Sequence, residues 1–357
     1  MLIFMKIRIY TEDNHAPSSD WRSNLILILK AFWGDGTDWD RESIAYIRDY
    51  FTFADTIGSA DIVALPMAWN YYVSRQKIRL ALDLAERADR FGKRVMIWSE
   101  GDNSARIPFE NIMLFQYSIQ RSRRRRFEYA RTPFTRDYAA IYLNHQIAYR
   151  PKPDKPLIGF CGQAASKRPW LLRLRNLARN LEAHFKAVYF DPPPLGLTVN
   201  FRAKVLRRLQ SSPLVSTRFI IRSSYGGRQT DQAAVDEYVR NLHDTDYTVC
   251  MRGGGNYSIR FPETLSMGRI PIFVDTDCVL PYDFKIDWKQ YCVWVDEADI
   301  DRIGEIVAAF HEQLSPSEFT DLQRECRRIW EEYLTQPQFF KHFYTHFEDA
   351  RIPVSGS

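Results

Sequence analysis

Long apolar runs are missing from this sequence of 357 residues. No stretch approaches the roughly 18–20 apolar residues that a membrane-spanning helix needs. The opening MLIFMKIRIY has a short apolar run followed by Lys6 and Arg8, whereas a signal peptide carries its charges first. We therefore expect a first strand here, not a signal peptide, and no membrane anchor.

Cysteine is scarce, and two familiar cofactor signatures are absent. The five cysteines have no paired spacing, so we expect free buried thiols and no zinc site: Cys161, Cys250, Cys278, Cys292 and Cys326. A dinucleotide-binding dehydrogenase would need G-x-G-x-x-G after an early strand. The first expected strand leads instead into TEDNHAPSSDW, which has no glycine, and this excludes that class.

The composition is that of a well-packed globular protein with two domains. Hydrophobic residues make up 45% and aromatic residues 14% of a chain long enough for two cores. A proline-rich stretch, RPKPDKP at 150–156, predicts a linker. We expect a first domain over 1–150, a second over 151–335, and a C-terminal helix in 336–357 that crosses back onto the first domain.

Apolar runs alternate with helical patterns in both halves. In the first half, strands are expected near 6–10, 61–65, 94–99 and 112–117, with a helix over 73–91 that stops at Gly92. In the second half, a strand is also expected at 187–190. Alternating strands and helices predict parallel sheets, which bind ligands beyond the carboxyl ends of their strands.

The segment 247–299 carries the clearest functional signal. An apolar strand ends in Arg252, a run of three glycines begins at Gly253, and a helix opens near Arg260. Such a loop lets backbone N–H groups approach a phosphate, and guanidinium groups match phosphate geometry. Glu263 lies one helical turn after Arg260, and a carboxylate there suits ribose hydroxyls. The segment predicts a nucleotide-sugar site, with Ser258 as a further donor; the alternative is a surface ion pair between Arg260 and Glu263.

About 50 residues here resemble the C-terminal half of exostosin-like glycosyltransferases of family 47. The shared pattern places Arg-Gly after a cysteine-bearing strand, then Arg-x-x-Glu, Gly-x-Ile-Pro, Leu-Pro and Asp-Trp. The matching residues are Cys250, Arg252, Gly253, Arg260, Glu263, Gly268, Ile270, Pro271, Leu280, Pro281, Asp287 and Trp288. Met251 stands where the family usually has proline.

The resemblance implies an α/β protein of GT-B architecture, with two Rossmann-like domains facing each other across a cleft. The first domain would bind a glycan acceptor and the second a nucleoside-diphosphate sugar. The reaction would be inverting and would extend a surface polysaccharide, lipopolysaccharide or capsule chain. Arg252 and Arg260 would hold the diphosphate. Gly162, Lys167 and Arg168, in the loop after an expected strand, would be a second phosphate-facing turn or an ordinary strand–helix turn.

An inverting transfer needs a base that deprotonates the acceptor hydroxyl. The loops after the first domain's strands offer three candidates. Asp102 lies roughly where the family carries an aspartate, Glu100 is close by, and His15 follows the first strand. We expect Asp102 or Glu100 in this role, with His15 as a loop cap or acceptor contact.

Asp275-Thr276-Asp277 resembles the metal-binding Asp-x-Asp of another glycosyltransferase fold. In a GT-B layout, arginines and a helix dipole can neutralise the diphosphate instead. We therefore expect ordinary loop carboxylates here, no required metal and no cofactor beyond the donor sugar.

A mild net charge of +5 is concentrated in one run, formed by Arg121, Arg123, Arg124, Arg125 and Arg126. The run is either a solvated face or a contact for anionic lipid or a lipid-linked acceptor. Nucleic acid has no supporting motif. We expect a cytoplasmic protein that can contact the inner face of the membrane. The other function left open is a glycan-binding or scaffold protein with a catalytically dead GT-B fold.

Overall fold

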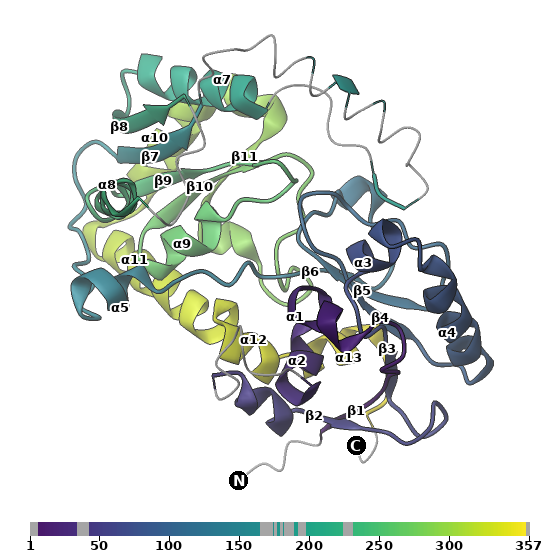
Figure 1. Cartoon of the computed structure of the whole chain (residues 1–357). Coiled ribbons are helices and arrows are strands. Elements are labelled where there is room, and N and C mark those ends of the chain that lie inside the picture. The colour runs from purple at the N-terminus through teal and green to yellow at the C-terminus, as the bar shows by residue number, and fades with distance from the viewer. Residues whose placement is uncertain are drawn as a thin grey trace. The chain divides into compact units, whose positions relative to one another are not determined.

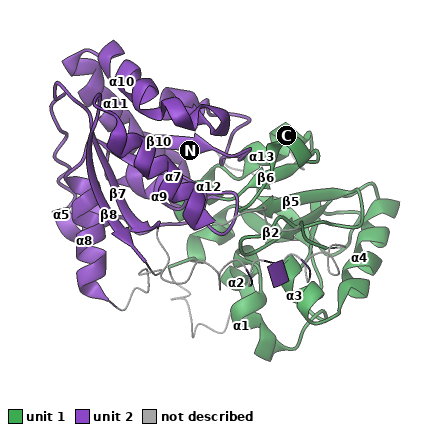
Figure 2. Ribbon diagram, turned by 90° about the horizontal axis from the view of Figure 1, so that it is seen from above, with its two compact units in different colours: residues 1–131, 186–191, 336–357 green, residues 132–185, 192–335 purple. Residues whose placement is uncertain are grey.

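The computed structural model describes residues 6–33, 43–164, 174, 177–178, 181, 189–191, 198–223 and 231–354 (Figure 1). The described residues form two compact units (Figure 2). Unit 1 draws on residues 1–131, 186–191 and 336–357, and unit 2 on residues 132–185 and 192–335. Each unit is built on its own parallel sheet, so each is described by itself.

Unit 1 contains a sheet of six parallel strands in the order β2-β1-β3-β4-β5-β6. The strands are β1 (Ile7–Tyr10), β2 (Phe51–Phe53), β3 (Ile62–Ala64), β4 (Val95–Trp98), β5 (Ile112–Gln116) and β6 (Glu128–Ala130). The helices are α1 (Trp21–Asn24), α2 (Leu27–Trp33), α3 (Trp69–Ser74), α4 (Ile78–Arg90), α12 (Gln336–Lys341) and α13 (Tyr344–Ala350). The four expected strands are present; the short edge strands β2 and β6 were not predicted.

The C-terminal helices complete the core of unit 1. Phe343 stacks on Phe115 of β5 with ring centroids 4.9 Å apart, and Phe340 meets Phe51 of β2 edge to face. The Tyr129 hydroxyl of β6 donates a hydrogen bond to Asp349 at 2.6 Å. These large apolar contacts explain why the chain after residue 336 belongs to unit 1.

Unit 2 contains a sheet of five parallel strands in the order β11-β10-β9-β7-β8. The strands are β7 (Leu157–Gln163), β8 (Ser216–Arg222), β9 (Tyr247–Cys250), β10 (Ile270–Asp275) and β11 (Val293–Asp296). The helices are α5 (Tyr138–Leu143), α7 (Thr198–Ser211), α8 (Gln232–His243), α9 (Arg260–Ser266), α10 (Ile303–Gln313) and α11 (Pro316–Ile329). α7 packs with α10, and α9 packs with α5 and α11 (Figure 1). The α/β class and two Rossmann-like sheets, as a GT-B protein has, are confirmed.

Two boundaries differ from the expected ones. The single helix expected over 73–91 is interrupted because Gln76 adopts a left-handed conformation (φ 55°), which separates α3 from α4. Gly92 does end α4, at a φ of 64°. Residues 132–150 pack with unit 2, so the division falls between Arg131 and Thr132.

Buried contacts explain where residues 132–150 belong. Asp137 caps α5 and receives a forked pair of hydrogen bonds, at 2.9 and 2.8 Å, from Arg327 of α11. Ala139 of α5 is part of an apolar cluster with α8 and Met267. Residues 189–191, by contrast, belong to unit 1, where Phe190 forms an isolated antiparallel bridge with Ala105; the strand expected over 187–190 otherwise lies outside the described residues.

Candidate functional site

The predicted phosphate loop lies at the carboxyl edge of the sheet in unit 2. β9 and β7 are adjacent parallel strands, so Arg252 and Gln163 emerge on the same edge. The loop 251–259 follows β9 and leads into α9. This is the edge at which open parallel sheets bind ligands.

Arg260 reaches from the start of α9 back to β7. Its Nη2 donates a hydrogen bond to the Cys161 carbonyl at 2.9 Å, and its Cζ lies 4.6 Å from the centroid of the Phe160 ring. Its Nε is buried and has no hydrogen-bond partner in the part of the chain that the structure describes. A Cβ on Gly162 would come within 2.0 Å of Arg260 Nη2, so the close approach of this guanidinium requires glycine there.

Arg252 is the second guanidinium at this edge. Its Cζ lies 5.2 Å from the Phe201 ring centroid, and its Nε is also buried without a partner. Burial lowers the pKa of Arg252, and the nearby Glu297 carboxylate opposes that shift. The group stays charged at neutral pH because an arginine starts from so high a pKa.

A third arginine, which the sequence did not single out, ties the two strand ends together. Arg202 of α7 donates hydrogen bonds to the carbonyls of Arg252 and Gln163, each at 3.1 Å. Its only sequence signal was its place in a basic helical segment. Three guanidinium groups therefore gather beyond β7 and β9, a concentration of positive charge that suits a diphosphate.

The glycine loop is held by its own hydrogen bonds. The Gly253 N–H donates to the Tyr257 carbonyl at 3.1 Å, and the Gly253 carbonyl accepts from the Thr198 hydroxyl at 3.0 Å. Asn256 is engaged with residues 276 and 277. The Ser258 hydroxyl is buried and has no partner, and it does not cap α9.

Three donors in nine residues thus lie buried without a hydrogen-bond partner among the described residues: the Nε atoms of Arg252 and Arg260 and the hydroxyl of Ser258. Burying a polar group without a hydrogen bond costs about 1–3 kcal/mol. A cluster of such donors beside a glycine loop is what an anion-binding site requires before its ligand arrives.

Glu263 is held differently from the sequence-based expectation. It is 7% exposed, and its two carboxylate oxygens accept hydrogen bonds from the hydroxyls of Tyr138 (3.4 Å) and Tyr238. Burial raises the pKa of Glu263 above its usual value. Within the described residues it forms no ion pair with Arg260, so the surface ion-pair interpretation is wrong. The tyrosines, from α5 and α8, were not predicted as site residues.

The candidate bases of unit 1 follow β1 and β4. Glu100 is about half exposed and accepts an ion-pairing hydrogen bond from Arg131, whose Cζ lies 4.2 Å from the Trp98 ring centroid. The side chain of Asn70 in α3 accepts a hydrogen bond from the Glu100 N–H at 2.7 Å and donates one to the Glu100 carbonyl at 2.8 Å. Asp102 lies on the same loop and is exposed.

His15 is buried at 2% exposure, unlike these carboxylates. Its Nδ1 lies 2.6 Å from the Tyr72 hydroxyl and its Nε2 lies 3.5 Å from Glu12. Burial lowers the pKa of His15, although Glu12 opposes the shift. Both ring nitrogens therefore face partners inside unit 1, and the imidazole is not presented to a substrate.

Comparison with known protein families identifies the kind of domain that contains the loop after β9 and the loop after β4. The exostosin GT47 domain matches residues 96–310, more than half of the 357 residues. The chain belongs to the exostosin GT47 domain family. The matched segment includes Glu100, Asp102 and the whole loop from Arg252 to Glu263; it does not include His15.

Relatives within the family align over limited segments. Exostosin-1 of Drosophila melanogaster is 32% identical over 116 residues, covering 32% of this chain and 14% of that protein. Probable glucuronosyltransferase 47 A of Physcomitrium patens is 25% identical over 141 residues, covering 38% of this chain and 28% of that protein. The chain thus spans less than a third of the length of these relatives.

One solved structure shows a remote likeness. The crystal structure of TarM covers 71% of this chain and 54% of its own chain, at 9% sequence identity and a TM-score of 0.30. At that score the likeness carries no argument about fold or function.

Asp275 and the cysteines, which the sequence also singled out in this GT47 protein, are buried. Asp275 is buried and accepts the Cys278 N–H at 2.9 Å, so it shapes its own turn. The described residues hold no group of three potential metal ligands. All five cysteines are buried and free, and burial raises the pKa of Cys250 to about 12, which keeps its thiol protonated. Lys167 and Arg168 lie outside the described residues.

The arginine run presents fewer exposed charges than its sequence suggests. Arg124 donates to the Glu128 carbonyl at 2.7 Å, and Arg125 pairs with the Glu128 carboxylate at 3.1 Å. Arg121, Arg123 and Arg126 are exposed. No helix in the described part of the chain is long and apolar enough to cross a membrane.

Proposed function

We propose that this exostosin GT47 protein transfers a sugar from a nucleoside-diphosphate sugar to a glycan acceptor, with inversion and without a required metal. The observation that carries the proposal is the cluster of unpartnered buried donors on Arg252, Ser258 and Arg260. It lies at the ligand-binding edge of a Rossmann-like sheet within the segment that matches the family. The acceptor we propose is a polysaccharide or lipid-linked chain.

In this proposal the arginines hold the diphosphate and stabilise its charge as the donor bond breaks. Preorganised donors are effective because they do not have to reorient when charge develops. Arg202 and Gly162 act indirectly, since the first ties the strand ends together and the second makes room for Arg260. Glu263 has residual lone pairs for a ribose hydroxyl, but its tyrosine contacts also tie α9 to α5 and α8.

A nucleotide panel tests the donor site. We expect UDP, GDP, CMP or dTDP, alone or as the sugar conjugate, to raise the thermal stability of the protein selectively, also in EDTA. A ligand at about 100 times its Kd stabilises by roughly 2.7 kcal/mol. The absence of a shift with any nucleotide would favour a glycan-binding protein with a dead transferase fold. A shift that EDTA abolishes would contradict the metal-free site.

We propose Asp102 as the base that removes the acceptor proton, with Glu100 as the second candidate. Substitution of the true base by its amide should lower kcat by about 100- to 10,000-fold, because proton transfer is lost. Nucleotide binding should be unchanged. The comparison is Asp102→Asn against Glu100→Gln, measured as turnover with the donor that the panel identifies. Full activity in both variants would remove both carboxylates from the mechanism.

A further inference from the structure

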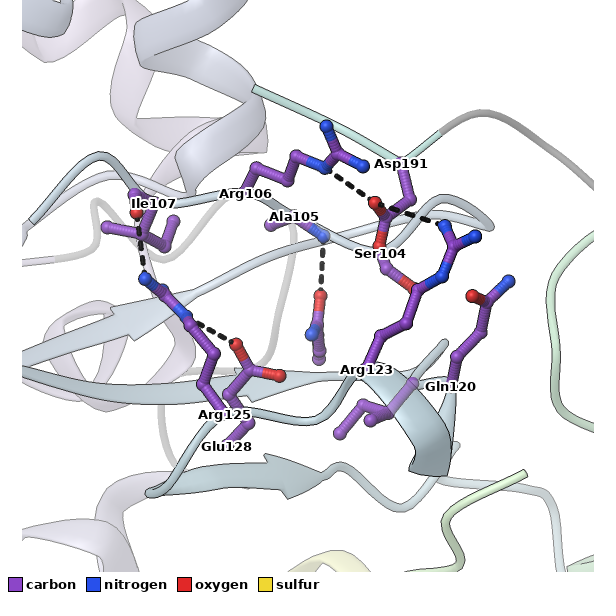
Figure 3. Close-up of a pocket in the computed structure, with 11 residues that line it drawn as sticks. Ser104, Ala105, Arg106, Ile107, Gln120, Arg123, Arg125, Glu128 and Asp191 are labelled. Atoms are coloured by element: carbon purple, nitrogen blue, oxygen red, sulfur yellow. Dashed lines mark hydrogen bonds and ion pairs between the residues drawn. The ribbon is translucent and has the colours of Figure 1, made fainter. Parts of the chain in front are cut away.

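Unit 1 contains a polar pocket that the proposed transfer site does not use (Figure 3). It has a volume of about 330 Å³ and lies between the loop after β4, at 104–107, and the segment after β5, at 119–125. Its lining includes Gln116, at the carboxyl end of β5, and Glu128, the first residue of β6. Its volume is at the small end of the range for ligand pockets.

The pocket is built around a buried amide. Gln116, at the end of β5, is 2% exposed, and its Oε1 accepts the Ala105 N–H at 2.7 Å. Because a backbone N–H can only donate, this bond fixes which end of the amide faces Ala105. Nε2 must then point elsewhere, and it makes no hydrogen bond with the described residues. Gln120 adds a second, half-buried amide to the lining.

Three guanidinium groups line the same space. Arg125 donates to the Ile107 carbonyl at 3.0 Å and to Glu128 at 3.1 Å, yet its Nη2 is buried and has no partner among the described residues. Arg106 and Arg123 both approach one oxygen of Asp191, at 2.6 and 3.9 Å, as Figure 3 shows. The Asp191 carboxylate thus already sits where two arginines would receive a negatively charged group.

The lining selects the chemistry of a ligand. Guanidinium groups recognise a carboxylate, phosphate or sulfate, and amides recognise hydroxyl groups. Among the described residues, the lining contains no aromatic side chain on which a nucleobase could stack. A small ring with several hydroxyls and one negative charge matches this set of groups better than a nucleotide does.

We propose that this pocket binds a saccharide unit that carries a negative charge, and that the Asp191 carboxylate competes with the charge of that unit. That the pocket binds a charged saccharide follows from its lining alone. That this saccharide is part of the acceptor rests on the proposed function. Binding itself requires no donor and no turnover, so it can be tested apart from the nucleotide site.

Calorimetry with free sugars on the chain of 357 residues tests the pocket. Glucuronate and glucose 6-phosphate are the charged probes, which distinguish a carboxylate from a phosphate, and glucose is the neutral one. We expect at least one charged sugar to bind at least tenfold more tightly than glucose. Equal binding of all three sugars, or binding of none, would overturn the proposal.

Two variants and a matched control locate the binding. Arg123→Ala removes an exposed guanidinium of the lining and should lower the affinity for the charged sugar at least fivefold. Asp191→Asn removes the competing carboxylate and should raise the affinity for the charged sugar at least fivefold. Loss of an aspartate with a structural role alone would not raise this affinity. Arg126→Ala, in the same run but outside the lining, should change nothing. Unchanged affinity in both lining variants would overturn the proposal, whatever the nucleotide panel shows.

Discussion

Replacing Arg260 by alanine should weaken nucleotide binding by about 10- to 150-fold and lower turnover by at least as much. The range follows from a charge-assisted hydrogen bond, which contributes about 1.5–3 kcal/mol. The unpartnered Nε of Arg260 is the group that would form this bond. The measurement is titration of the preferred nucleotide by calorimetry, followed by steady-state kinetics with its sugar conjugate.

Three further variants separate a local role from general charge. Arg260→Lys keeps the charge but loses the planar fork, so its affinity should lie between those of the wild type and Arg260→Ala. Gly162→Ala should reproduce part of the loss, because its Cβ displaces the Arg260 guanidinium. Arg207→Ala, an exposed arginine of α7, should bind like the wild type. A folded Arg260→Ala protein with undiminished affinity would take Arg260 out of the donor site.

Replacing Glu263 by alanine should lower the free energy of unfolding by about 2–5 kcal/mol. Two tyrosine hydroxyls would lose their acceptor, at about 1–3 kcal/mol each, and a cavity would form among α5, α8 and α9. Urea denaturation monitored by circular dichroism measures the change. A loss below about 0.5 kcal/mol would show that the tyrosine contacts contribute little. Lost donor binding in Glu263→Ala is therefore no proof of a ribose contact.

Glu263→Gln is the matched control, because its neutral amide does not titrate. The pH dependence of stability can therefore be compared between this variant and the wild type. Burial raises the pKa of Glu263 above the ordinary value of 4.5, so folding favours the protonated carboxyl. This contribution to stability is fully present below pH 4.5 and is lost as the pH rises through the raised value. The wild type should therefore lose stability relative to Glu263→Gln as the pH rises above 4.5. A difference that does not vary with pH would contradict the raised pKa.

The sequence predicted well wherever a local pattern has a local physical cause. Alternating apolar runs predicted the central strands of both sheets, and Gly92 marked the end of α4. The order of arginines, glycines and Glu263 around one strand predicted both the edge of unit 2 and the family. Edge strands of three residues, such as β2 and β6, carry too few apolar positions to produce such a pattern.

The partners of each side chain were decided by the tertiary structure alone. Glu263 lies one turn from Arg260 in the sequence, yet its hydrogen bonds come from tyrosines about 25 and 125 residues away. Arg202 links the ends of β7 and β9 through the carbonyls of Gln163 and Arg252, a contact that the sequence spacing of these residues does not indicate. Asp191 reaches the arginines after β4 and β5 only because residues 189–191 pack with unit 1.

What the sequence determined by itself is the class of fold and the family, because these depend on residue types at short spacing. What only the tertiary structure decided is which charges are buried, which donors lack partners and where the second polar pocket lies. These properties depend on contacts between residues far apart in the chain. Burial then changes the pKa and the hydrogen-bonding needs of each group, so the same residue types acquire different roles.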